Sequence, residues 1–195
     1  KKRKKKTKKP PFLIYATPPC QGMSSNGAGK ILREIRDGKR KPEDPRNRLI
    51  IPTVEIIKKL RPEWVILENV SNMKNTIISD ENGEYINIIE YIYRELGDEY
   101  VGCPEVVNCA DYGIPQMRKR LITIFSRSPR GVEYFKKYGK FMPPQTHYEE
   151  ETFFAKKWIT LRDAISKLPP LDAKEGKNER KDFHPWHFVP IMNQE

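Results

Sequence analysis

The sequence predicts an α/β fold built around an open sheet. Short apolar runs without a helical period, typical of buried strands, alternate with segments whose apolar residues recur every three to four positions, typical of amphipathic helices. Two chemically interesting residues, Cys20 and Glu68, directly follow the first two apolar runs. Because active sites in open α/β sheets lie at the carboxyl ends of strands, their placement supports the same fold class.

The strands are defined by apolar runs bounded by turn-forming residues. The first is expected to be a buried strand that stops at Pro18-Pro19, and the second a buried strand that ends before Glu68 and Asn69. The four expected strands are 12–17, 64–67, 100–108 and 121–126.

Helices are expected where one face is apolar, at 49–60, 86–96, 131–138 and 160–168. Arg61-Pro62 should end the first of them and Gly97 the second, while Thr160 is a candidate N-cap for the last. Between the first strand and about Pro45 the chain is rich in Gly, Ser, Asn and basic residues, which predicts a long loop with at most a weak helix at 31–36.

Composition excludes several classes of protein. The net charge is +11, but eight of the 37 basic residues lie within 1–9, so the rest of the chain is close to balanced. No apolar run approaches the roughly 20 residues of a membrane span, and no signal-peptide pattern opens the chain. Three cysteines without a pairing or zinc-like spacing favour free thiols in a reducing compartment, and hence a cytoplasmic protein.

Three weak signals carry the chemistry. Cys20 sits on a turn stiffened by two prolines and is either a nucleophile or a small buried side chain, whereas Cys103 and Cys109 are expected to be structural. Glu68 ends an apolar strand, where desolvation favours the protonated, proton-donating carboxyl; the alternative is an acid that faces water or pairs with an arginine. Arg118 and Arg120 should project the same way and could bind a phosphate, a carboxylate or a base carbonyl, unless they are an ordinary basic patch.

Taken in order, these motifs resemble those of the DNA cytosine-5 methyltransferases. The resemblance runs from about residue 12 to residue 190, and each motif alone is modest while the ordered set is specific. It is carried by Pro18-Pro19-Cys20-Gln21-Gly22, Asp44-Pro45-Arg46-Asn47-Arg48-Leu49, Glu68-Asn69-Val70, the segment 108–116 that reads Asn-Cys-Ala-Asp-Tyr-Gly-Ile-Pro-Gln, Gln116-x-Arg118-x-Arg120, Pro144-Gln145-Thr146-His147 and Thr160-Leu161-Arg162-Asp163.

The resemblance implies a site and a reaction. It implies a Rossmann-like sheet that uses S-adenosylmethionine to methylate C5 of a cytosine flipped out of double-stranded DNA, with no metal. Cys20 matches the nucleophile that adds to C6, and Glu68 the carboxyl that protonates N3 and holds the amine. The other implied roles are contact with the ring O2 for Arg120, support of the site for Arg118, contacts to the substrate for Pro19, Gln21, Ser24 and Arg46, and bracing of the Cys20 turn for Asn69.

The sequence also departs from that family. A strand with a glycine-rich loop for the cofactor is not found before Phe12, which leaves Leu49 as the clearest match to a cofactor contact. Residues 1–10 are therefore interpreted as a basic tail or linker, 11–128 as the catalytic half of the methyltransferase domain, and 129–195 as a connection to the target recognition region. The chain is expected to be part of a longer polypeptide, or to be completed by a complementary polypeptide if the enzyme is split.

Other functions stay open. Cytosine-5 methylation of transfer RNA uses a similar site, and a nucleic-acid-binding or regulatory subunit without catalytic activity would explain the basic tail. Mere binding does not need the Cys20 thiol, which argues against the second alternative. A metal site at His184 and His187 is disfavoured because no acid or thiol completes it.

Overall fold

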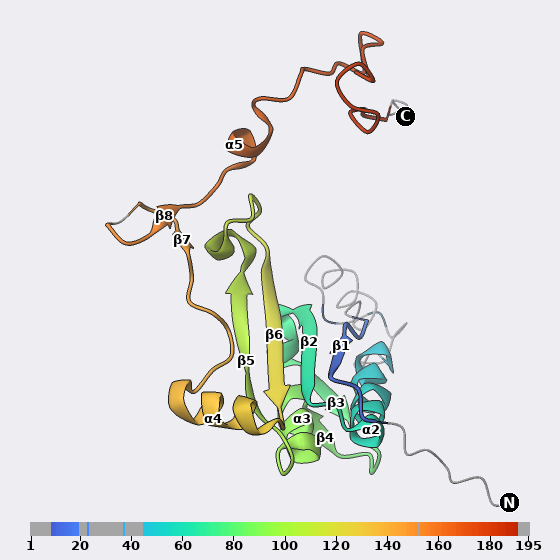
Figure 1. Cartoon of the computed structure of the whole chain (residues 1–195). Helices are drawn as coiled ribbons and strands as arrows, with labels where there is room; N and C mark the ends of the chain where they lie inside the picture. Colours follow the sequence, from blue (N-terminus) through green and yellow to red (C-terminus); the bar gives the residue numbers. More distant parts are fainter. Residues whose placement is uncertain (1–8, 20–22, 24–36, 38–44, 152, 191–195) are drawn as a thin grey trace, which may run out of the picture.

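The computed structural model describes residues 9–19, 23, 37, 45–151 and 153–190. Its centre is a four-stranded sheet in the order β1-β2-β6-β5 (Figure 1). The strands are β1 (Leu13–Ala16), β2 (Trp64–Val70), β5 (Val101–Asn108) and β6 (Lys119–Ser126). β1 and β2 are parallel, whereas β6 runs antiparallel to both of its neighbours. The predicted α/β class is confirmed, with a mixed sheet.

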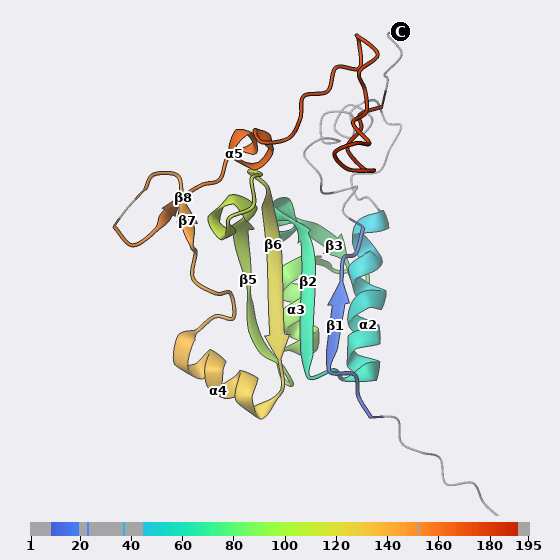
Figure 2. The ribbon, with the colours of Figure 1, turned by 45° about the horizontal axis from the view of Figure 1, so that its top comes forward.

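One face of the sheet carries the main hydrophobic core. Two helices, α2 (Ile50–Leu60) and α3 (Ile88–Leu96), lie along this face, as Figure 2 shows. Their buried residues recur at helical spacing and pack against inward-facing strand residues such as Val65, Leu121 and Phe125. Burial of these side chains, at about 25 cal/mol per Å² of apolar surface, is what fixes the helices on the sheet.

The opposite face is covered near one end of the sheet. Residues 129–138 form α4 (Pro129–Tyr138), whose N-cap is Ser128 rather than a residue near the predicted start at 131. The ring of Phe141 packs edge-on against Trp64 with 5.1 Å between centroids, and it also contacts Tyr134 and Phe135 of α4.

The second strand is longer than its apolar run. β2 continues through Glu68 and Asn69 to Val70, because its pairing with β6 extends to the Val70–Arg120 position. The prediction that Glu68 and Asn69 follow the strand was therefore wrong. Their side chains alternate across it, so Asn69 is buried with Val65 and Leu67 while Glu68 lies on the other face.

The first strand is not buried, contrary to prediction. Leu13 is 42% exposed and Tyr15 is 61% exposed. Among the described residues β1 pairs only with β2, so it forms one edge of the sheet. An apolar run signals burial only when neighbours cover both faces and both edges of the strand.

A hairpin precedes the second core helix. β3 (Ile77–Ser79) and β4 (Tyr85–Asn87) pair with each other, so the helix expected from residue 86 begins at Ile88 instead. Asn87 ends the hairpin and caps the helix, since its side-chain oxygen accepts from the Ile89 N–H at 2.8 Å. Asn is favoured at such N-caps, which explains the later start.

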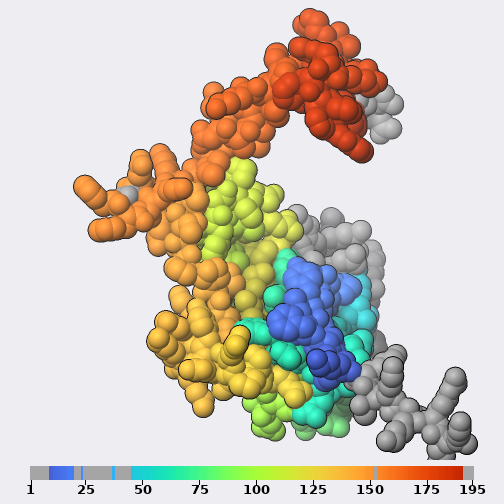
Figure 3. Space-filling model, viewed as in Figure 1, coloured from blue at the N-terminus to red at the C-terminus, as the bar shows by residue number. Residues whose placement is uncertain are grey.

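Beyond α4 the chain forms an arm that extends from the sheet (Figures 1 and 3). The arm carries β7 (His147–Tyr148), β8 (Lys156–Lys157) and α5 (Leu161–Ile165). The predicted N-cap is confirmed, because Thr160 and Asp163 form a reciprocal capping box, although α5 ends at Ile165 rather than 168. The described residues also form three short 3-10 turns: η1 (Pro45–Leu49), η2 (Ser71–Asn75) and η3 (Cys109–Tyr112).

Candidate active site

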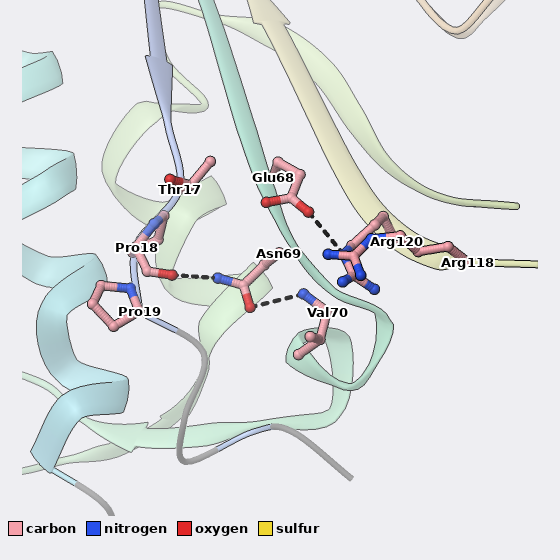
Figure 4. A pocket seen from close by; sticks show the side chains of 8 residues that line it. All are labelled: Thr17, Pro18, Pro19, Glu68, Asn69, Val70, Arg118 and Arg120. Atoms are coloured by element: carbon pink, nitrogen blue, oxygen red, sulfur yellow. Dashed lines mark hydrogen bonds and ion pairs between the residues drawn. The ribbon is translucent and has the colours of Figure 1, made fainter. Parts of the chain in front are cut away.

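A pocket of about 250 Å³ opens where β1 and β2 end and β6 begins (Figure 4). It is lined by Thr17, Pro18, Pro19, Glu68, Asn69, Val70, Arg118 and Arg120. The antiparallel β6 brings its first residues beside the last residues of β2, and the parallel β1 ends at the same edge of the sheet. Three segments that are far apart in the sequence thus converge on one cavity.

A carboxylate and a guanidinium face each other in this pocket. Arg120 Nε lies 2.9 Å from Glu68 Oε1, and both side chains are largely but not fully shielded from water. The cross-strand register explains the contact, because Arg120 is opposite Val70 and thus diagonal to Glu68 on the same face. The pocket therefore offers a carboxylate and a fixed cation side by side, which suits recognition of a ring with an amide-like edge.

The turn after β1 is held in place by a hydrogen bond from the Asn69 side chain. Its Nδ2 donates to the Pro18 carbonyl at 2.8 Å, and its Oδ1 accepts from the Val70 N–H at 2.9 Å. Both polar atoms of this buried side chain are thus used, which avoids the cost of an unpaired buried amide. The contact holds the Pro18-Pro19 turn against β2.

The arginine that precedes β6 is held by its backbone. Arg118 N–H donates to Asn108 Oδ1 at 3.1 Å, and the Arg118 carbonyl accepts from the Cys109 N–H at 3.0 Å. Asn108 was not a candidate from the sequence, although an Asn at the end of a strand is a known signal for a side chain that closes a turn.

The predicted site residues divide into three groups. Those that line the pocket are Pro19, Glu68, Asn69, Arg118 and Arg120. Arg46 and Leu49 lie in η1 and are not among the lining residues. Cys20, Gln21 and Ser24, like the weak helix expected at 31–36, lie outside the described residues.

Two residues of the segment that follows the pocket, Met23 and Asp37, are described. Met23 is buried and belongs to the hydrophobic core. Its carbonyl accepts from Asn72 Nδ2, in η2, at 3.2 Å. Met23 is therefore fastened to the residues just beyond β2.

The other two cysteines fit a structural role. Burial raises the pKa of the Cys103 thiol, and its sulfur lies 3.7 Å from the Gly139 carbonyl. A raised pKa keeps the side chain in the thiol form, which is a poor nucleophile. Cys109 lies in η3, where its N–H serves the Arg118 carbonyl.

Comparisons with known proteins show the family of this chain. The family model of C-5 cytosine-specific DNA methylases matches residues 1–186. The chain belongs to this family. Among curated relatives, the Type II methyltransferase M.DdeI of Desulfomicrobium norvegicum is 30% identical over 171 residues, covering 87% of this chain, and M.HhaI of Haemophilus parahaemolyticus is 30% identical over 171 residues, covering 88%.

This DNA methylase chain is shorter than the relatives it matches. It spans 35% of the length of M.DdeI and 42% of that of M.HhaI. A solved structure of a proposed DNA modification methyltransferase encoded in an E. coli prophage is similar in fold, with a TM-score of 0.50, 22% identity, and coverage of 85% of this chain and 38% of that one. The Rossmann-like methyltransferase fold is thereby shown.

The described part of the chain contains no candidate metal site and no candidate membrane-spanning helix. Its His, Cys, Asp and Glu side chains form no cluster of three or more that could hold a metal ion. His187 Nε2 lies 2.8 Å from the Pro169 carbonyl, and His184 Nδ1 accepts from the Trp186 N–H, so both rings have local partners. None of the described helices has the length and apolar character that crossing a bilayer requires.

Proposed function

We propose that the complete enzyme to which this chain belongs transfers a methyl group from S-adenosylmethionine to C5 of cytosine in double-stranded DNA. The observation that carries the proposal is the pocket at the end of β1, where Glu68 and Arg120 face each other beside Pro19. Cys20 directly follows Pro19 in the sequence. The Type II methyltransferases among the relatives support DNA as the substrate and a restriction-modification context.

The thiol of Cys20 makes C5 reactive. C5 of cytosine is too weak a nucleophile to take a methyl group directly, so the Cys20 thiolate first adds its electron pair to C6. A covalent sulfur–carbon bond then moves electron density through the ring toward C5 and N3. This is nucleophilic catalysis, in which one difficult step is divided into two easier ones.

The Glu68 carboxyl supplies the proton that relieves this charge at N3. When Glu68 donates to N3 and accepts from the exocyclic amine, it distinguishes cytosine from thymine by the same two contacts. Arg120, 2.9 Å from Glu68, is placed to donate to the ring O2 once the base displaces part of their ion pair. The Pro19 carbonyl is a further acceptor for the amine, and Arg118 lines the entrance of the pocket.

The base must leave the DNA stack to reach this pocket, at a cost of a few kcal/mol. We infer that the segment 22–48 contacts the DNA around the flipped base through Ser24 and Arg46, and that the adjacent Gln21 also contacts the substrate. The abundance of Gly, Ser and Asn in this segment suits a loop that closes over a substrate.

The methyl donor is not held by the described residues alone. Leu49 is half-exposed and lies outside the base pocket, and no glycine of the described part sits in a turn between a strand's carboxyl end and a helix beside that pocket. S-adenosylmethionine, when bound, supplies an electrophilic methyl group. The steps that this chain's residues perform are addition of the thiol, protonation of N3 and, after methylation, release of the C5 proton and of the thiol.

The test is transfer of labelled methyl groups by the complete native enzyme. Duplex DNA is expected to become labelled on cytosine C5, and a Cys20→Ser variant is expected to lose the label while it still binds DNA. A Cys103→Ser variant is the matched control and should retain activity, because the Cys103 thiol lies outside the pocket. Label that enters only transfer RNA would contradict DNA as the substrate, and tight DNA binding without any transfer would contradict the enzymatic function.

A further inference from the structure

All three oxygen atoms of Asp111, in η3, accept hydrogen bonds from residues of the arm. Its Oδ2 accepts from Gln145 Nε2 and its Oδ1 from Trp158 Nε1, each at 3.0 Å. Its backbone carbonyl accepts from the Thr146 N–H at 3.0 Å. Three donors from residues 34 to 47 positions later in the chain thus meet on one aspartate, and hydrogen bonds to a charged acceptor are the stronger kind.

These contacts hold both strands of the small ladder in the arm. Gln145 and Thr146 directly precede β7, and Trp158 directly follows β8. The two strands pair in parallel, and the Trp158 N–H donates to the Tyr148 carbonyl at 2.8 Å. Asp111 therefore forms hydrogen bonds with the residues just before β7 and with the residue just after β8.

Two residues that follow Asp111 in the sequence, Tyr112 and Gly113, also favour contact with the arm. Gly113 has a φ of +82°, and a Cβ placed on it would lie 2.7 Å from the His147 ring. Any other residue would be strained there and would push β7 away. Tyr112 adds a hydrogen bond from its hydroxyl to the Pro143 carbonyl at 3.1 Å.

The same turn fixes Arg118 of the base pocket. Between Asn108 and Arg118 the chain closes on itself through the Arg118 N–H to Asn108 Oδ1 and the Cys109 N–H to the Arg118 carbonyl. One short segment thus holds a pocket arginine on one side and the arm on the other. Figure 1 shows this turn at the end of β5 beside β7.

Past Trp158 the arm has no other such attachment. In the described part, no residue from 159 to 190 makes a hydrogen bond to the sheet or to its turns, and α5 has no buried residue. Large apolar side chains such as Leu161, Phe183 and Trp186 are exposed on it. The direction in which this segment leaves the sheet is set at Asp111.

We propose that Asp111 is a positioning residue. It fastens the arm to the turn between Asn108 and Arg118, which also holds Arg118 of the base pocket, and so keeps the DNA-contacting region beyond Trp158 aligned with that pocket. The inference rests on the proposed function, since residues 129–195 are expected to lead into the region that recognises the DNA substrate. Loss of Asp111 then lets the arm swing about η3, so that DNA is held less well while the pocket chemistry is unchanged.

The experiment compares Asp111→Ala, Asp111→Asn and Asp98→Ala in the complete native enzyme. Amide hydrogen exchange at Thr146 reports the attachment without any need for activity, and steady-state kinetics on duplex DNA separate KM from kcat. Asp111→Ala is expected to speed exchange at Thr146 and raise the KM for DNA about tenfold or more, with kcat within about threefold. Asp98→Ala removes an exposed carboxylate from the turn after α3, outside both the pocket and the arm, so it should leave both readouts near wild type.

Two further variants separate positioning from simple loss of structure. Asp111→Asn should be close to wild type, because the Gln145 amide can turn round and accept from the new Asn amide while Oδ1 still accepts from Trp158. A Gln145→Ala/Trp158→Phe double variant removes the donors and leaves η3 intact, so it should reproduce the KM effect of Asp111→Ala.

Unchanged Thr146 exchange in Asp111→Ala would overturn the proposal, as would a loss confined to kcat. If the wild-type enzyme proves inactive on DNA, the proposed function fails while the exchange result still decides whether Asp111 holds the arm.

Discussion

At the scale of single residues, Glu68 combines two requirements that oppose each other. Its ion pair with Arg120 at 2.9 Å favours the carboxylate, whereas proton donation to N3 needs the acid. We propose that entry of the base resolves the conflict, because the base excludes water and offers Arg120 a second acceptor in the ring O2. The protonated form of Glu68 is then expected only in the complex with substrate.

Replacing Glu68 by Gln tests this role. Glu68→Gln retains the shape and a hydrogen bond but cannot deliver a proton, so methyl transfer should fall about a hundredfold or more. Because the pair is partly exposed, the free energy of unfolding should change by no more than about 1 kcal/mol. Single-turnover kinetics and thermal unfolding measure the two effects. Glu105→Gln, on β5 and outside the pocket, is the control, and an equal loss there would contradict the assignment.

The sequence predicts these residues better than their contacts. Pro19, Glu68, Asn69, Arg118 and Arg120 could be selected because their types and order follow a family pattern, and the structure lines one pocket with them. The contacts of Asp111 with residues of the arm could not be predicted. They join positions more than 30 residues apart, and no local periodicity encodes such a pairing.

At the scale of elements, the β3–β4 hairpin is tied to the core by a buried carboxylate. Asp80 forms an ion pair with Arg94 of α3 at 2.9 Å, and its Oδ1 accepts from the N–H groups of Glu84 and Asn82. Its backbone carbonyl accepts from Arg48 of η1 at 3.1 Å. The hairpin therefore links η1, which carries Arg46 and Leu49, to α3.

This network makes stability depend on pH. The hydrogen bond from Arg94, together with the Glu84 and Asn82 N–H groups, holds the pKa of Asp80 below its ordinary value of 3.8. A lowered pKa means that the contribution of Asp80 is fully present above the unfolded-state pKa and is lost as the pH falls through the folded-state value.

Asp80→Asn should consequently lower the thermal midpoint at pH 7 by several degrees, since Arg94 loses its charged partner. The difference from wild type should shrink as the pH falls below about 4, where the wild-type carboxyl also becomes protonated. Calorimetric unfolding from pH 7 to pH 3 measures both. A difference that stays constant over this range would contradict the account; Asp98→Asn, in an exposed turn, is the control.

The exposed edge of the sheet at β1 bears on how the chain associates with other chains. Leu13 and Tyr15 are exposed on it, and α2 presents a second apolar stripe, Leu49, Ile56 and Leu60, outside its buried face. Exposed edge strands with apolar side chains pair with other chains. In the complete enzyme we expect a further strand to cover this edge.

The isolated 195-residue chain should therefore self-associate. A Leu13→Lys/Tyr15→Lys variant should shift it toward the monomer, because edge lysines oppose strand pairing. Sedimentation velocity over a range of concentrations measures the effect. A lysine pair on the far side of the sheet, Ile114→Lys/Met117→Lys, is the control; if the chain is monomeric without any substitution, the β1 edge needs no cover.

At the scale of the whole molecule, the alternation of apolar runs predicts the α/β class and four strands correctly. It does not predict that β6 is antiparallel, nor that the hairpin β3–β4 precedes α3. Strand direction follows from how connections close in space, and the short connection between β5 and β6 permits an antiparallel pair where a parallel one would need a crossover.

Among the described residues, Leu49 is the one position that the sequence predicts to contact the methyl donor. By itself the chain should bind S-adenosylmethionine with a Kd weaker than about 100 μM. Titration calorimetry on the 195 residues measures this directly. Binding in the low micromolar range would mean that these residues suffice for the cofactor, and would remove the need for a complementary portion of the enzyme.

The proposed reaction depends on covalent catalysis by Cys20, which directly follows Pro19 of the pocket in the sequence. The most direct measurement offers the complete native enzyme duplex DNA that contains 5-fluorocytosine, with S-adenosylmethionine present, and transfer RNA with the same base in parallel. Fluorine at C5 blocks the final elimination, so the account predicts a gel-stable adduct with DNA that is absent in Cys20→Ser. An adduct with RNA alone, or none with either despite tight binding, would contradict it.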